Sequence, residues 1–147
     1  MNKKRLLKLA DLLEADANNP EGAKFDIRKW GNGKGEPTVS CGTKVCAMGL
    51  AAVSGVFKKQ GLTCKVERYR DLKDGFVINI GFKGENDWYT DGFIAAQRLF
   101  EITSTESDFL FSDSSYSGRT TGRRGELYVA KRIRDFVAGK VAPAIAW

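Results

Sequence analysis

Three cysteines, Cys41, Cys46 and Cys64, are the residues that could supply a nucleophile. Cys41 lies just before a predicted helix, whose N-terminal end can lower a thiol pKa, so it is the candidate reactive thiol. The chain has no histidine, which removes the usual base for activating a cysteine and the usual nitrogen ligand of zinc. We therefore predict no catalytic residue, no metal and no cofactor. An enzyme or small-ligand binder that uses a cysteine or paired carboxylates is still an open alternative.

Basic side chains are the second group of residues that could have a chemical role. The chain has 24 Lys and Arg residues against 18 Asp and Glu residues, a net charge of +6, which favours anionic partners. Arginines and tyrosines gather near a predicted C-terminal helix over residues 123–138. Phosphates bind the charges and single-stranded bases stack on the rings, so nucleic acid is one alternative partner. The candidate binding residues here are Tyr116, Arg119, Arg123, Arg124 and Arg132, and we expect the side chains of Arg123, Arg124 and Arg132 to be solvated.

Two adjacent aromatic residues, Trp88 and Tyr89, lie in a predicted loop. Exposed aromatic side chains commonly supply the strongest contacts of protein interfaces. These two residues are therefore candidate contacts for a protein partner. Packing over a neighbouring hairpin is the simpler explanation for them.

A run of small and apolar residues, 40–55, predicts the element around which the fold is organised. Cys46, Gly49, Leu50 and Val53 recur at helical spacing. We predict a central buried helix over residues 43–53, with Thr43 as the N-cap. Glycine weakens a helix interior, so Gly49 predicts a close approach of another backbone.

The other patterns predict one α+β domain over residues 1–147. Residues 63–69 and 76–82 alternate in polarity and predict an antiparallel hairpin. Further helices are expected near 3–15, 92–100, 105–111 and 123–138, which gives four or five helices packed on a small antiparallel sheet. No apolar run approaches the ~20 residues that a membrane-spanning helix needs, so no membrane partner is expected.

The residues Phe25-Asp26-x-x-x-Trp30, followed by Cys41-Gly42-Thr43-x-x-Cys46-Ala47-x-Gly49-x-Ala51, resemble a pattern in small uncharacterised bacterial and bacteriophage proteins. No known activity of that group can be carried over. The resemblance implies a phage or mobile-element setting.

The sequence thus favours a non-catalytic accessory protein of phage or mobile-element type that binds a host or bacterial macromolecule. Inhibition of that macromolecule, or a counter-defence role, would fit this setting. A protein partner is favoured, and nucleic acid is the alternative. An odd number of cysteines without metal or redox spacing is typical of reduced thiols, so we predict a cytoplasmic location, in the host cytoplasm if the chain is phage-encoded. The patterns do not determine an oligomeric state.

Overall fold

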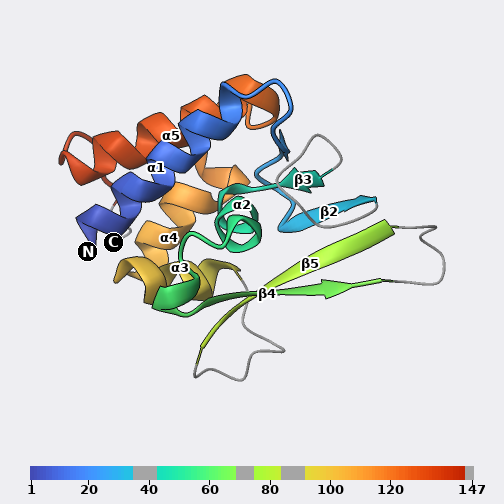
Figure 1. Ribbon diagram of the computed structural model, residues 1–147. Coiled ribbons are helices and arrows are strands. Elements are labelled where there is room, and N and C mark those ends of the chain that lie inside the picture. The colour runs from blue at the N-terminus through green and yellow to red at the C-terminus, as the bar shows by residue number, and fades with distance from the viewer. Residues whose placement is uncertain (35–42, 69–74, 84–91, 145–147) are drawn as a thin grey trace.

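Helices and a mixed sheet make up the part of the chain that the computed structural model describes, residues 1–34, 43–68, 75–83 and 92–144 (Figure 1). The helices are α1 (Lys3–Ala17), α2 (Ala47–Ser54), α3 (Gly92–Phe100), α4 (Ser104–Phe111) and α5 (Gly122–Val137), with 3-10 turns η1 (Lys58–Gln60) and η2 (Asp113–Ser115). The strands are β1 (Lys24–Phe25), β2 (Gly31–Lys34), β3 (Thr43–Val45), β4 (Leu62–Glu67) and β5 (Gly75–Phe82). The predicted α+β fold class is confirmed. No helix of the described segments is long and apolar enough to cross a membrane.

The strands form one sheet in the order β1-β3-β2-β5-β4. β1 pairs in parallel with β3, while the other neighbouring strands are antiparallel. The predicted hairpin is confirmed as β4 and β5, with Val66 opposite Ile78. The sheet is larger than that hairpin because three short strands from the first third of the chain extend it through β2.

The prediction that the central helix begins at Thr43 is wrong, because residues 43–45 form strand β3. Thr43 pairs with Gly33, and Val45 pairs with Gly31. The helix begins at Ala47, where the Sγ of Cys46 accepts a hydrogen bond from the Gly49 N–H at 3.3 Å and so provides the N-cap. Thr43 and Val45 are β-branched, which favours a strand, and the partner β2 lies too far away in sequence for a local pattern to reveal it.

Gly49 makes the close contact that its place in the helix predicts. A Cβ atom at this position would overlap the Trp30 carbonyl oxygen, so α2 can lie here only with glycine. A Cβ atom at Gly92, at the start of α3, would lie 2.3 Å from the indole of Trp30, and the indole meets the Phe93 ring edge-on at 5.1 Å between centroids. Trp30 therefore fits between two helices, at a point where each provides a glycine.

The two faces of the sheet differ in character. Phe25, Val45, Phe76, Ile78 and Ile80 are buried, and α2 and α3 pack against β5. On the opposite face, Lys24 of β1 is paired with Lys44 of β3, and both side chains are exposed. Lys44 is also paired with Asn32 of β2, which places Lys34, two residues further along β2, on the same face. We call Lys24, Lys34 and Lys44 the lysine face.

Helices α1 and α5 lie side by side (Figure 1) and run in opposite directions. The Arg134 guanidinium, near the end of α5, forms ion pairs with Asp11 and Glu14 of α1. Its hydrogen bond holds the pKa of Glu14 below the ordinary value. At the other end of the pair, the start of α5 meets the end of α1. This second junction is where the candidate site lies.

Candidate functional site

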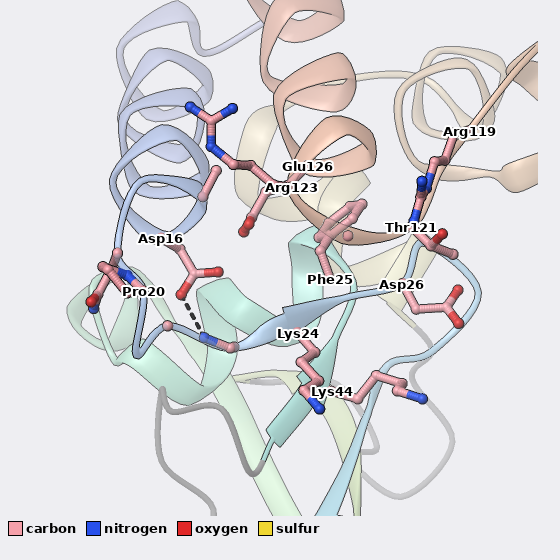
Figure 2. A pocket seen from close by; sticks show the side chains of 15 residues that line it. Asp16, Pro20, Lys24, Phe25, Asp26, Lys44, Arg119, Thr121, Arg123 and Glu126 are labelled. Atoms are coloured by element: carbon pink, nitrogen blue, oxygen red, sulfur yellow. Dashed lines mark hydrogen bonds between the residues drawn. The ribbon is translucent and has the colours of Figure 1, made fainter.

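A pocket of about 470 Å³ opens where the end of α1, strands β1 and β3, and the start of α5 meet (Figure 2). Two features of its lining stand out. Asp16 of α1 and Glu126 of α5 contribute two carboxyl groups, which we call the carboxyl pair. Basic side chains from three parts of the chain line the same pocket and are called the basic rim: Lys24, Lys44, Arg119 and Arg123.

Asp16 is held in place by the turn that follows α1. Its Oδ1 accepts a hydrogen bond from the Ala23 N–H at 2.9 Å (Figure 2). Gly22 lies so close that a Cβ atom there would be 2.6 Å from the same oxygen. The side chain is only 6% exposed. Backbone contacts therefore fix one oxygen of Asp16 and leave the other to the space beside α5.

Glu126 is more deeply buried, at 2% exposure. Its carboxyl group points toward that of Asp16 (Figure 2), and no N–H group of the described residues donates a hydrogen bond to it. Burial, then a hydrogen bond with Asp16 and the negative charge of Asp16, raise the pKa of Glu126 to about 10. Glu126 Oε2 and Asp16 Oδ2 are both buried without a hydrogen-bond donor. The raised pKa favours a protonated Glu126, which can donate a hydrogen bond to Asp16, so the two carboxyl groups can share one proton.

The basic rim brings cations from separate elements to the lining of the same pocket. Lys24 and Lys44 are neighbours in the parallel β1–β3 register. Arg123 lies one helical turn before Glu126, and its Nη2 donates to Asn18 Oδ1 at 2.8 Å. Arg119 comes from the segment that leads into α5. Four cations around one pocket favour a ligand that carries negative charge at its outer end.

A third acid in the lining, Asp26, is already neutralised within the protein. Its Oδ1 accepts hydrogen bonds from the Arg28 backbone N–H at 3.0 Å and from the Arg28 Nε at 3.2 Å. Burial would raise the pKa of Asp26, but the hydrogen bonds from Arg28 outweigh it and hold that pKa below its ordinary value. Asp26 therefore adds little net charge to the pocket.

The structure brings together two of the predicted binding residues, Arg119 and Arg123, at the basic rim. Arg124 is exposed on the first turn of α5 but does not line the pocket. These three arginines therefore lie at one end of α5, whereas the sequence suggests a basic surface along the whole helix.

The expectation that Arg132 is solvated is wrong. Its Nη1 donates to the carbonyl oxygens of Phe109 and Ser115 at 3.0 and 2.7 Å. Its guanidinium lies 3.7 Å from the centroid of the Tyr116 ring. Tyr116 is itself buried, and its hydroxyl donates to the Leu110 carbonyl at 2.6 Å. Arg132 and Tyr116 thus connect α4, η2 and α5, because their side chains donate hydrogen bonds to backbone carbonyl groups that lie wholly or partly out of water.

Other predicted residues fall outside the described part of the chain. They are the aromatic pair Trp88 and Tyr89 and the candidate thiol Cys41. Cys46, in contrast, is placed clearly: it is buried as predicted, and burial raises the pKa of its thiol to about 12. No group of three or more cysteine, aspartate or glutamate side chains within residues 1–34, 43–68, 75–83 and 92–144 is arranged to hold a metal.

The sequence reasoning missed the carboxyl pair and the two lysines of the basic rim. A signal for the pair was present, since Glu126 precedes the buried residues Val129, Ala130 and Ile133 at spacings of three, four and seven. Asp16 likewise continues the buried stripe of Leu9 and Leu13 along α1. An acid on an apolar stripe indicates either a buried pair or a site. Lys24 and Lys44 gave no such signal, because only the parallel pairing brings them together.

Comparison of the chain with protein-family models, with curated proteins and with solved structures found no match in any of the three.

Proposed function

We propose that this protein binds nucleic acid, through the basic rim and the adjoining lysine face. The observation that carries the proposal is the basic rim itself. Its four cations come from β1, β3, the segment before α5 and α5, and all four line one pocket. Arginine forks and lysine ammonium groups are the usual protein partners of phosphate oxygens.

The local charge balance supports an anionic partner. Asp26 is paired with Arg28, and the other acids of the pocket lining are the two members of the carboxyl pair. The four cations of the basic rim therefore exceed the acidic charge of the pocket lining. Lys34 extends this positive surface across β2, away from the pocket. An extended polyanion such as a single strand could contact both parts at once.

A protein partner is the competing proposal, and an accessory role in a phage or mobile element is the setting that the sequence resemblance suggests for either partner. The aromatic pair on which a protein interface was predicted lies outside the described residues. The basic rim, in contrast, lies within them. An acidic protein surface could use the same cations, so the experiment must separate the two partner classes.

Fluorescence anisotropy with a labelled oligothymidylate of about 15 nucleotides, measured over a series of salt concentrations, tests the proposal. We expect binding that weakens steeply with salt, because each phosphate contact contributes about 0.7 to the slope of log K against log salt for single strands. Replacing Lys24 and Lys44 with glutamine should remove about two contacts and reduce that slope by about 1.4.

The matched control is the double replacement of Lys3 and Lys4 with glutamine. It removes the same charge at the opposite end of α1 from the pocket, so it should leave the slope nearly unchanged. Equal losses in the two double variants would indicate only a general effect of net charge. That result, or no oligonucleotide binding even at low salt, would refute the proposed function and leave an acidic protein as the better partner.

A further inference from the structure

The deep part of the pocket differs chemically from its rim. The rim presents exposed cations, whereas the buried part presents the carboxyl pair, in which Asp16 Oδ2 and Glu126 Oε2 have no hydrogen-bond donor among the described residues. A ligand that satisfies both regions must carry an anionic group outside and N–H donors inside. A nucleotide has this arrangement, because its phosphate and the hydrogen-bonding edge of its base lie at opposite ends.

Glu126 is the group that points to a ligand here. It is buried, its carboxyl group points into the pocket (Figure 2), and its Oε2 has no donor among the described residues. Each carboxyl oxygen has two lone pairs, so one shared proton leaves further acceptor positions on the pair unused. Buried acceptors that lack donors are rare in folded proteins, which makes this pair the best candidate for contact with a ligand.

The size of the pocket suits a small molecule or a single nucleotide. Its volume of about 470 Å³ falls within the range typical of small-molecule sites, roughly 300–1,000 Å³. Phe25, Pro20 and Ala23 contribute apolar groups to the lining. Bases that are unstacked from a strand are bound in this way, with ring contacts on the faces and hydrogen bonds at the edge.

We propose, building on the proposed function, that this pocket receives an unpaired guanine nucleotide of the bound strand, with Asp16 and Glu126 accepting hydrogen bonds from its base. Guanine presents two adjacent donors, N1–H and N2–H₂, which match neighbouring carboxyl oxygens. Uracil and thymine present one donor between two acceptors, so they would place carbonyl oxygens against the carboxyl pair. Adenine and cytosine present one amino group beside an acceptor. The basic rim then holds the phosphate of the same nucleotide.

The test compares two labelled oligonucleotides of about 15 nucleotides, one all thymidine and one with a single central dG. We expect the dG-containing strand to bind about tenfold more tightly or better, as bidentate base contacts typically discriminate. Glu126→Gln replaces one acceptor oxygen with an amino group, whose first N–H can keep the hydrogen bond to Asp16 while its second N–H stands where the base needs an acceptor. It should abolish the preference for dG while leaving the binding of oligothymidylate and its salt slope unchanged. Glu21→Gln, on the exposed turn after α1, is the matched control and should keep the preference.

The outcomes separate this inference from the proposed function. Binding of both strands with equal affinity overturns the guanine pocket and leaves nucleic-acid binding in place. A dG preference that survives in Glu126→Gln overturns the assignment to the carboxyl pair. Absence of binding by either strand at low salt overturns both proposals. Circular dichroism of the variant confirms that a lost preference reflects the side chain and not unfolding.

Discussion

Replacing Glu126 with glutamine also tests whether the carboxyl pair shares a proton, independently of any ligand. Glutamine has the shape of a protonated glutamate and can donate an N–H to Asp16, but it cannot lose that proton. In the wild type, the shared proton must leave the carboxyl pair before Glu126 can ionise between α1 and α5. The other charged residues of the pocket lining are Asp16, Lys24, Asp26, Lys44, Arg119 and Arg123.

The sign of the effect follows from the raised pKa. Glu126 has a pKa of about 10 in the folded protein, whereas the ordinary pKa of a glutamate in an unfolded chain is about 4.3. Between these values the folded protein binds one proton more than the unfolded chain. The stabilisation is therefore complete below the unfolded pKa and is lost as pH rises toward the folded pKa.

The size of the effect depends little on the exact folded value. Anywhere well inside this window the free energy of unfolding falls by about 1.4 kcal/mol per pH unit because of this one group. From about pH 5 to about pH 8 the loss is ~4 kcal/mol, a large share of a typical domain stability of about 5–15 kcal/mol. Glu126→Gln has no carboxyl group to titrate at this position, so its free energy of unfolding lacks this dependence on pH. The free energy of unfolding of this variant should match that of the wild type at about pH 5 and exceed it by several kcal/mol at about pH 8.

Urea unfolding of both proteins, followed by circular dichroism at a series of pH values, measures the difference directly. Comparing wild type and variant cancels the titration of all other groups, provided that they titrate alike in both. Glu21→Gln should give a curve parallel to the wild type, because its carboxyl group lies on an exposed turn. Parallel curves for Glu126→Gln as well would mean that Glu126 is ionised in the folded protein, and the shared proton would be refuted.

Four further substitutions or labels test the packing. Gly49→Ala should lower the melting temperature sharply, because the added methyl group overlaps a carbonyl oxygen; an unchanged melting temperature would contradict the contact. Thr43→Val should leave the free energy of unfolding in urea unchanged or raise it, since the buried hydroxyl has no hydrogen-bond partner among the described residues. A loss of about 1 kcal/mol, as expected when an N-cap is removed, would contradict the strand assignment of Thr43. Arg132→Lys should lose ~2 kcal/mol or more of unfolding free energy, because an ammonium group cannot replace a stacked guanidinium; a smaller loss would mean that the stacking is unimportant. Peptide mapping after thiol labelling of the native protein should find exposed Cys64 modified much faster than buried Cys46, and equal rates would argue against the buried N-cap.

Much of the fold could be predicted because its signals are local. The helices over residues 92–100 and 123–138 follow from the periodicity of residues such as Leu99 and Ile133, and the β4–β5 hairpin follows from alternation. The error at Thr43 has a different origin. Residues 43–45 are strand because they pair with β1 and β2, and pairing across the sequence is invisible to a local pattern.

The candidate site was harder to predict for the same reason. Arg119 and Arg123 could be named because they stand in a basic segment, but their partners Lys24 and Lys44 come from the first third of the chain. Arg132 carries the same charge as its neighbours and yet serves the interior, because two backbone carbonyls and an aromatic ring lie within its reach. Charge type alone does not distinguish a binding arginine from a structural one.

The contacts of Trp30 limit which substitutions the sequence pattern can accept. Residues 25–30 and 43–51, the two halves of this pattern in the described part of the chain, touch one another: Phe25 lies beside Val45 in the β1–β3 pairing, and the Trp30 carbonyl meets Gly49 of the helix that Cys46 caps. A mutation in one half of this pattern is tolerated only with a compensating change in the other half. The residues of the pocket, except for Phe25 and Asp26, are not bound by that constraint. Substitutions in the lining of the pocket can therefore accumulate in this chain without disturbing the framework in which Trp30 meets α2.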